Sequence, residues 1–251
     1  MPAVFVHGNP ESAAIWDDLF AHLSRKDVIA LSPPGFGAPV PPRFDATADA
    51  YFAWLVDELT IIDGPIDLVG HDWGGGHVMR VAMSRPDLIR SWTSDITGAL
   101  DPEYEWHDMA KTWQTPLIGE TTVAMMVNAP LPMREAQFRS FGLGDAAPKV
   151  AAAVNDEMGR CILTLYRSAK QPAMRNWGKD LEKASARPGL VIAAERDKYV
   201  GGVDLARRSA ERAGARLAVL PGVGHWWMCE NPALGAQTLD AFFADVERAG
   251  A

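Results

Sequence analysis

The stretch Leu68-Val69-Gly70-His71-Asp72-Trp73-Gly74-Gly75 decides the fold of this chain. The mostly apolar run from Ile66 to Val69 predicts a buried strand, and a helix is expected from about Gly76 to Met83. Glycines on both sides of the tip are needed where a turn is so tight that a Cβ would clash with the neighbouring strand or helix. We therefore interpret this stretch as a nucleophile elbow with Asp72 at its tip.

The residue at the tip is a carboxylate, and this limits the chemistry. A nucleophilic Asp72 displaces a leaving group from an sp3 carbon and becomes an alkyl ester, so an acyl substrate is not expected. The pattern Gly-x-Asp-x-Gly also fits a loop that ends in an ordinary N-cap Asp. The rest of the chain has to decide between the two.

Composition sets the broad class. The chain has 251 residues, of which 48% are hydrophobic, so it is long enough for one large α/β domain or two small ones. The net charge of −8 and the scattered basic residues disfavour nucleic acid and anionic membranes as partners. No apolar run approaches the roughly 18 residues of a membrane span, and the N-terminus lacks a signal pattern. We therefore expect a soluble cytoplasmic protein with reduced cysteines.

Strand patterns alternate with helix patterns along most of the chain, which predicts a mostly parallel sheet covered on both faces. Strands are expected at Ala3–Val6, Asp27–Leu31, Ile66–Val69, Ile89–Ile96, Leu190–Ala194 and Arg216–Leu220. Besides the elbow helix, helices are expected at Trp16–Leu23, Ala46–Leu59 and Pro232–Val246.

Between Gly98 and about Pro188 this alternation stops. The segments there have helical spacing, are rich in Met and aromatic residues, and contain no convincing strand. We expect a helical cap domain at residues 100–185, inserted into a core domain formed by residues 1–99 and 186–251. A minority of its apolar side chains should line a pocket between the two parts.

A nucleophilic Asp needs a base to activate water and an acid to orient that base. His225 follows the last strand after a Gly-rich loop and is the candidate base. Asp197 follows the preceding strand, whereas Asp95 lies near the end of the strand after the elbow, and either would keep the chain order nucleophile, acid, base. We prefer Asp197 and keep Asp95 as the alternative.

Asn9 and Trp73 complete the expected site. Their backbone N–H groups, one after the first strand and one directly after the nucleophile, are placed to form an oxyanion hole. Their side-chain N–H groups, aimed into one dry pocket, would solvate a leaving anion such as a halide.

With His7-Gly8-Asn9-Pro10, the elbow, Asp197 and Gly224-His225, the chain resembles the α/β-hydrolase fold. Within that fold it is similar to the Asp-nucleophile branch of haloalkane dehalogenases and epoxide hydrolases. The resemblance covers nearly the whole chain and implies a helical cap after the strand that follows the elbow. It also implies that Asp72 attacks carbon and that water activated by His225 hydrolyses the ester.

The resemblance leaves two activities open. Asn9 with Trp73 is similar to the halide-binding pair of many haloalkane dehalogenases. The segment around Tyr166 resembles the one that carries a cap tyrosine in epoxide hydrolases, and no second such tyrosine is apparent. Where it would be expected, the chain offers His107 and Trp113, so Tyr166, His107 and Trp113 are candidate cap acids or substrate contacts.

One departure from the family pattern affects the sheet. The chain begins at what is normally the third strand, so a sheet of about six strands, essentially parallel, is expected. The missing edge strands leave a surface at which a homodimer can form.

Three functions follow in order of preference. The first is a haloalkane dehalogenase-like hydrolase of a small or medium apolar substrate, and the second is an epoxide hydrolase that uses Tyr166 as acid. The third is a non-catalytic hydrolase-fold binding protein. None implies a metal or an organic cofactor, since there is no Cys/His ligand cluster and no phosphate-binding Gly loop.

Overall fold

The computed structural model describes residues 1–250 and is built around a six-stranded sheet in the order β2-β1-β3-β4-β5-β6. Every pair of neighbouring strands is parallel. The strands are β1 (Ala3–Val6), β2 (Val28–Leu31), β3 (Ile66–Gly70), β4 (Ile89–Ser94), β5 (Gly189–Ala194) and β6 (Arg216–Leu220). The expected sheet of about six parallel strands is confirmed.

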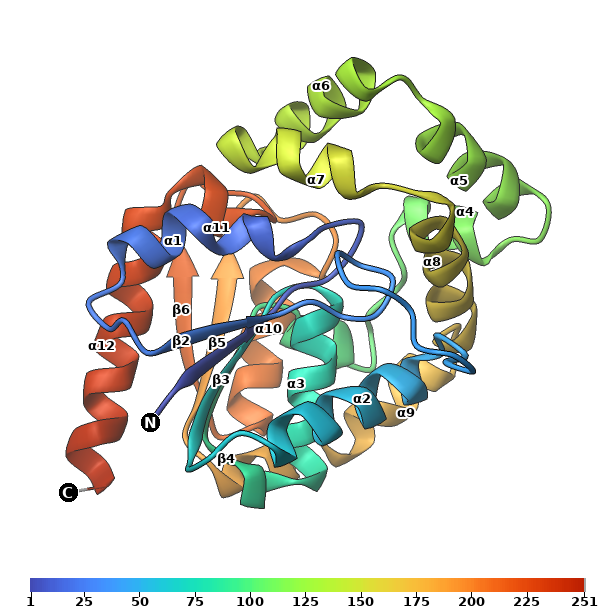
Figure 1. The fold of residues 1–251 in the computed structure, drawn as a ribbon. Helices are drawn as coiled ribbons and strands as arrows, with labels where there is room; N and C mark the ends of the chain where they lie inside the picture. Colours follow the sequence, from blue (N-terminus) through green and yellow to red (C-terminus); the bar gives the residue numbers. More distant parts are fainter. Residues whose placement is uncertain (251) are drawn as a thin grey trace.

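The burial of the strands follows from this order. The inner strands β1, β3 and β5 are buried along their whole length, whereas the edge strands β2 and β6 are partly exposed. Continuous apolar runs are typical of parallel strands that helices cover on both faces. Helices α1 (Asp17–His22) and α12 (Pro232–Gly250) cover one face, and α2 (Ala48–Thr60), α3 (Trp73–Ser84) and α10 (Gly202–Arg212) cover the other (Figure 1).

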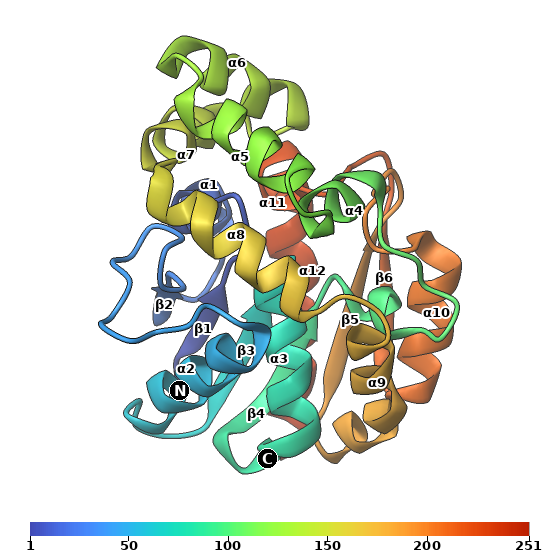
Figure 2. The ribbon, with the colours of Figure 1, turned by 90° about the vertical axis from the view of Figure 1, so that its right-hand side faces the viewer.

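The stretch between β4 and β5, residues 101–188, contains helices and no strand, and we call it the helical insert. Its α-helices are α4 (Asp108–Gln114), α5 (Ile118–Asn128), α6 (Leu131–Phe141), α7 (Ala147–Ala153), α8 (Asp156–Ser168) and α9 (Ala173–Trp177). Figure 1 shows α5, α6 and α7 beyond the carboxyl ends of the strands, and Figure 2 shows α8 leading from them back towards α9. The boundaries 100–185 of a separate cap domain stay a prediction.

Several element ends differ from the expectation, among them those of α3, β4 and α12. The elbow helix α3 begins at Trp73, three residues before Gly76, because Asp72 is its N-cap and the glycines that follow pack too closely against β1 and β4 to adopt another path. Strand β4 ends at Ser94, since Thr97 already begins a short 3-10 helix. Helix α12 continues past Val246 to Gly250.

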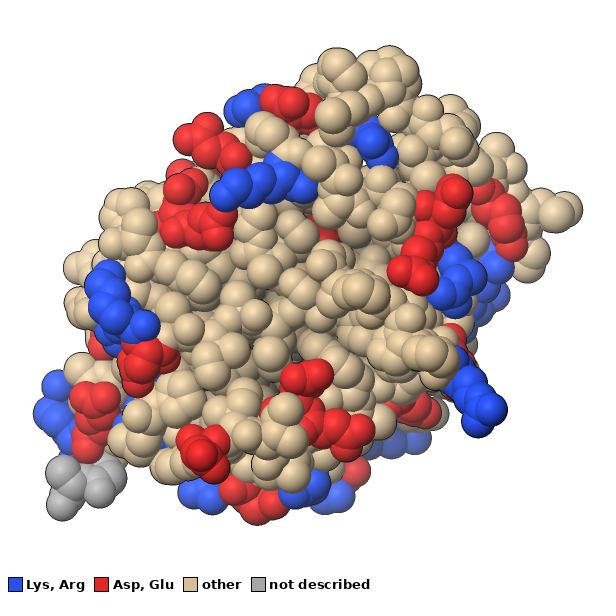
Figure 3. Space-filling model, viewed as in Figure 1, with Lys and Arg blue, Asp and Glu red and all other residues tan. Residues whose placement is uncertain are grey.

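Surface charge is mixed. On the face shown in Figure 3, acidic and basic side chains are interspersed, and neither sign forms a continuous patch there. Among residues 1–250, none of the helices combines the length and the apolar character that a membrane span requires.

Candidate active site

The elbow holds Asp72 in a strained backbone conformation, with φ 50° and ψ −129°. The glycines around it are required by close packing. A Cβ on Gly70 would lie 2.6 Å from the Cα of Gly75, and one on Gly74 would lie 2.2 Å from the carbonyl oxygen of Val6. The turn therefore fixes Asp72 at the carboxyl edge of the sheet, at the N-terminus of α3.

His225 and Asp197 lie beside Asp72 in one chain of contacts. The Nε2 atom of His225 is 3.5 Å from Oδ2 of Asp72, and its Nδ1 atom is 2.7 Å from Oδ2 of Asp197. The backbone N–H of Tyr199 donates to the other oxygen of Asp197 at 2.8 Å. The loops after β5 and β6 thus bring the expected base against Asp197, while Asp95 lies elsewhere.

The contacts among Asp72, His225 and Asp197 shift the pKa of each of the three groups. Burial opposes ionisation of Asp72, but the hydrogen bond and charge of His225 outweigh it and lower the pKa of Asp72 to about 2. Burial also lowers the pKa of His225, yet Asp197 and Asp72 raise it well above the ordinary value. The pKa of Asp197 is lowered, because the charge of His225 overcomes the desolvation of the carboxylate. The resting site therefore holds an imidazolium between two carboxylates.

Asp95 belongs to a second histidine. Its Oδ2 atom lies 2.5 Å from Nδ1 of His71 and accepts the indole N–H of Trp227 at 2.7 Å. Its Oδ1 atom accepts the backbone N–H of Asp72 at 3.1 Å. Asp95 therefore stabilises the elbow by accepting the backbone N–H of Asp72, and it makes no contact that would orient His225.

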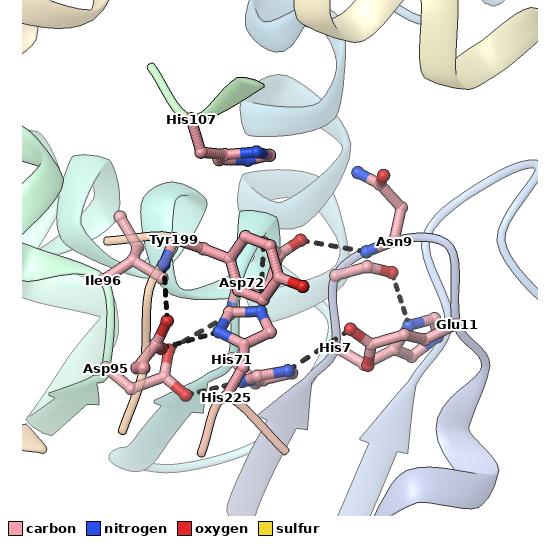
Figure 4. Close-up of polar contacts among 12 residues, drawn as sticks. His7, Asn9, Glu11, His71, Asp72, Asp95, Ile96, His107, Tyr199 and His225 are labelled. Carbon is pink, nitrogen blue, oxygen red and sulfur yellow. Dashed lines mark hydrogen bonds and ion pairs between the residues drawn. The ribbon is translucent and has the colours of Figure 1, made fainter. Parts of the chain in front are cut away.

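The far side of His71 faces a buried Glu11, with 3.2 Å between Nε2 and Oε1 (Figure 4). Burial lowers the pKa of His71, but the charges of Asp95 and Glu11 outweigh it and raise the pKa to about 10. Glu11, His71 and His225 each place one potential metal-ligand atom within 4.8 Å of the others. Since both imidazoles hold protons in this setting, the cluster is better suited to a polar network than to a cation.

A large cavity of about 310 Å³ opens above Asp72. Its walls come mainly from the helical insert and from the loops after β1, β5 and β6, and its apolar lining includes Met109, Met125, Met126, Phe138, Phe141 and Trp226. No Lys or Arg is present among the described residues that line it. The cavity is therefore suited to an uncharged, largely apolar molecule.

A second, small cavity of about 20 Å³ lies on another side of Asp72. Four residues line both cavities and so stand at their junction: Asp72, His107, Tyr166 and Tyr199. A molecule that reacts at Asp72 therefore meets a wide space on one side and a narrow one on the other.

The side chains of Asn9 and Trp73, which were expected in one pocket, line two adjoining cavities that share Asp72. Asn9 lines the large cavity and Trp73 lines the small one. The expected backbone role of Asn9 has a matching contact, because its N–H donates to Oδ1 of Asp72 at 3.0 Å. Its side-chain amide is buried and has no hydrogen-bond partner within residues 1–250. Side-chain direction at a tight turn is set by packing, which the motif alone does not specify.

His107, Tyr166 and Trp113 all reach the large cavity, as expected of substrate contacts. Figure 4 shows the His107 ring on the opposite side of Asp72 from His71 and His225. His107 is the N-cap of α4, and its Nδ1 atom accepts the backbone N–H of Ala110 at 3.2 Å. Because burial lowers the pKa of His107, the ring is neutral and its remaining proton is on Nε2.

Tyr166 is a buried phenol, and burial together with the charge of Asp72 raises its pKa well above 10. It therefore keeps its proton and can donate. Tyr104, which lines only the small cavity, already donates its hydroxyl proton to the carbonyl of Tyr199 at 2.7 Å.

Sequence reasoning missed Glu11, Tyr199 and Trp226. Tyr199 was detectable in principle, since it lies two residues after Asp197 in a loop at the carboxyl edge of the sheet. Trp226 adjoins His225 but reads as an ordinary packing aromatic. Glu11 follows the motif at residues 7–10, and only the structure shows that it is completely buried against His71.

Comparisons with known proteins agree with this architecture. A family model described as the alpha/beta hydrolase family matches residues 3–237. An uncharacterized protein of Mycobacterium tuberculosis is 22% identical over 99% of this chain and 77% of its own length. A haloalkane dehalogenase of Mesorhizobium japonicum is 29% identical over 48% of this chain and 42% of its own length. The crystal structure of a haloalkane dehalogenase from Bradyrhizobium elkanii superposes with a TM-score of 0.74 at 21% identity, covering 99% of this chain and 91% of that one.

Proposed function

Because the chain belongs to the α/β hydrolase family, we propose that it is a hydrolase that works through an ester of Asp72, with a haloalkane as the preferred substrate class. The observation that carries the proposal is the continuous contact chain from Asp72 through His225 to Asp197 beneath a large apolar cavity. Each member of the chain has a partner suited to its role in hydrolysis of an alkyl ester.

In the first step, Oδ2 of Asp72 forms a bond to the carbon, the carbon–halogen bond breaks, and the halide leaves with the bonding electrons. The low pKa of Asp72, about 2, keeps the nucleophile ionised at neutral pH. Oδ1 becomes the ester carbonyl oxygen and keeps the N–H of Asn9. The unpaired amide of Asn9 supports a halide leaving group, because it offers a buried N–H and no negative charge.

In the second step, Nε2 of His225 takes a proton from water, and the water oxygen attacks Cγ of Asp72. The tetrahedral intermediate expels the alcohol, which regains the proton from His225. His225 must be neutral for this, and the first step prepares it, since alkylation removes the charge of Asp72, one of the two carboxylates that raise its pKa. A carboxylate oxygen of the buried Glu11 lies within 4.8 Å of a ring nitrogen of His225, so Glu11 offers the water an acceptor.

An epoxide hydrolase is the second candidate, and the donors at the cavity junction favour it. Opening an epoxide at Asp72 leaves an alkoxide that needs a proton or a hydrogen bond. The phenol of Tyr166 and the Nε2–H of His107 line both cavities together with Asp72. This pair would replace the two cap tyrosines that the sequence resemblance led us to seek.

The test is a His225→Gln variant, incubated separately with 1-bromohexane and with styrene oxide and then measured by intact mass spectrometry. Without the base, the ester on Asp72 accumulates. A mass increase equal to the hexyl group supports the dehalogenase, and one equal to the whole epoxide supports the epoxide hydrolase. An Asp72→Asn variant is the matched control and should show no adduct. Absence of any adduct on folded His225→Gln protein contradicts both and favours a non-catalytic binding protein.

A further inference from the structure

The small cavity has one polar and one apolar end. Asp72, His107 and Tyr166 are on the side shared with the large cavity. The remaining wall is mainly apolar and contains buried residues of α3, of the region after β4, of α9 and of the loop after β5: Gly76, Ile96, Ala99, Met174 and Val200. The rings of Trp73, Tyr104 and Trp106 complete it. This end offers a small apolar group a place directly beside the nucleophile.

Gly76 keeps this end open. A Cβ on Gly76 would meet only Cδ1 of Ile96, at 3.7 Å, which is an ordinary contact. Gly70 and Gly74, in contrast, have no room for a side chain. Glycine is less favourable than alanine inside a helix, so close packing does not explain Gly76, whereas the cavity does.

We propose that the small cavity is a subsite for a second substituent on the reactive carbon and that it admits a group no larger than methyl. This proposal rests on the proposed function, because it takes Asp72 as the nucleophile. A cavity of about 10–15 Å³ holds one water molecule, so about 20 Å³ is close to the space that one methyl group needs. The substrate class is therefore primary halides and secondary halides that carry a methyl branch.

The geometry of displacement agrees with this assignment. Asp72 lines both cavities, so the carbon that it attacks lies at their junction. The long substituent extends into the large cavity, where the leaving group meets the side-chain amide of Asn9. The apolar end behind Gly76 remains for the third substituent of the carbon, which is hydrogen or methyl.

The experiment compares 1-bromohexane, 2-bromohexane and 3-bromohexane as substrates of the unmodified enzyme. The two secondary bromides have similar intrinsic reactivity, so a difference between them reports the subsite. We expect kcat/KM for 2-bromohexane to exceed that for 3-bromohexane by about tenfold or more, the range in which one methylene is discriminated. Equal values for the two secondary bromides overturn the proposal.

Three variants test whether the small cavity causes the difference between the bromohexanes. Gly76→Ala places a methyl group in the subsite and should lower the ratio of 2-bromohexane to 1-bromohexane turnover by about tenfold. Ile96→Val removes one methylene from the wall and should raise the ratio of 3-bromohexane to 2-bromohexane turnover. Met133→Ala changes an exposed side chain that lines neither cavity and should leave both ratios within about twofold, well inside that range.

The alternative occupant of the small cavity is the leaving group itself. A series of 1-chlorohexane, 1-bromohexane and 1-iodohexane distinguishes the two. If Gly76→Ala changes the order of these halides and not the branching ratio, the cavity holds the halide and the proposal is wrong. Loss of activity of Gly76→Ala on all substrates also overturns it. If the unmodified enzyme converts none of the bromides, the proposed function itself has failed.

Discussion

Two buried histidine–aspartate pairs lie ring against ring in this molecule, with 4.6 Å between the imidazole centroids of His71 and His225. The His225 pair reaches the large cavity and contacts the carboxylate of Asp72. The His71 pair has no solvent exposure at its histidine and is enclosed by Glu11, Trp227 and the backbone of Asp72. The same two residue types therefore serve different purposes, and access to the cavity decides which pair can transfer a proton to substrate.

The largest expected effect concerns the pair at the cavity. Asp197→Asn leaves the hydrogen-bond geometry near His225 but removes the charge that orients and stabilises the imidazolium. Hydrolysis of the ester should slow by about 10³-fold or more, within the range known for general-base catalysis. Single-turnover kinetics with 1-bromohexane measures the step. Asp145→Asn, at a side chain that is 94% exposed, is the control. Unchanged hydrolysis in Asp197→Asn would assign the orienting role to another residue.

For the pair formed by His71 and Asp95, we expect a loss of stability and not primarily a loss of catalysis. Asp95→Asn leaves the protonated His71 with fewer buried acceptors and disturbs the contacts to Trp227 and the Asp72 backbone. The free energy of unfolding should fall by about 3 kcal/mol, the usual cost of breaking a buried ion pair. Urea denaturation measures it, with Asp197→Asn as the comparison. A larger loss of stability in Asp197→Asn than in Asp95→Asn would reverse the roles given to the two pairs.

Stability should depend on pH, because the pKa of His71 is raised, and the raised pKa of His225 acts in the same direction. In the folded protein the pKa of His71 is about 10, against about 6.5 in an unfolded chain. A raised histidine pKa contributes stability that is fully present below pH 6.5 and is lost as the pH rises towards 10. The free energy of unfolding should therefore fall between pH 6.5 and 9.5, and it should fall less in a His71→Gln variant. Parallel curves for the two proteins would show that another group is responsible.

pH separates the two chemical steps as well. Formation of the ester needs only ionised Asp72, whose pKa is about 2, so its rate should be flat from pH 5 to 9. Hydrolysis needs neutral His225 and should accelerate as the pH rises. Rapid-quench measurements with mass detection should find more ester at low pH than at high pH. The reverse trend would mean that His225 is not the base.

The smallest effect is expected from Glu11→Gln, which removes one of the two charges that raise the pKa of His71. The pKa of His71 should fall below 10 and remain above 6.5, because Asp95 still faces the ring. NMR titration of the imidazole signals measures the change. An unaltered pKa would show that Glu11 is uncharged in the folded protein.

The sequence predicts the scaffold well because its signals are local. Buried parallel strands appear as short apolar runs, and β1 and β6 lie at the residues expected for them. The start of α3 was misplaced because glycine has a weak helix propensity, which close packing of Gly74 against β1 overrides.

The site is harder to predict, because its chemistry depends on which side chains converge. Asp72, His225 and Asp197 are brought together, whereas the choice between Asp197 and Asp95 could not follow from chain order. Both aspartates end parallel strands at the same edge of the sheet, and only the direction of each side chain assigns it to a histidine.

In the helical insert, too, the local structure could be predicted, whereas the shape of the cavities could not. Its helical character was visible in the residue spacing, and its residues that reach the cavities include the expected Tyr166, His107 and Trp113. The shapes of the two cavities, and the placing of Asn9 in one and Trp73 in the other, depend on long-range packing. No local pattern encodes such contacts.

Asp95 also has a consequence for motion. It binds the elbow backbone after β3, the ring of His71 and the indole of Trp227 in α11 (Trp227–Glu230), and it does so from the end of β4. Opening any of these elements breaks a buried charged hydrogen bond, so we expect them to open only together, as one cooperative unit in hydrogen exchange. The backbone amide of Asp72 should exchange as slowly as those of the central strands. We then expect the local opening motions that would admit a substrate to occur in the helical insert, where α5 and α6 are exposed to solvent.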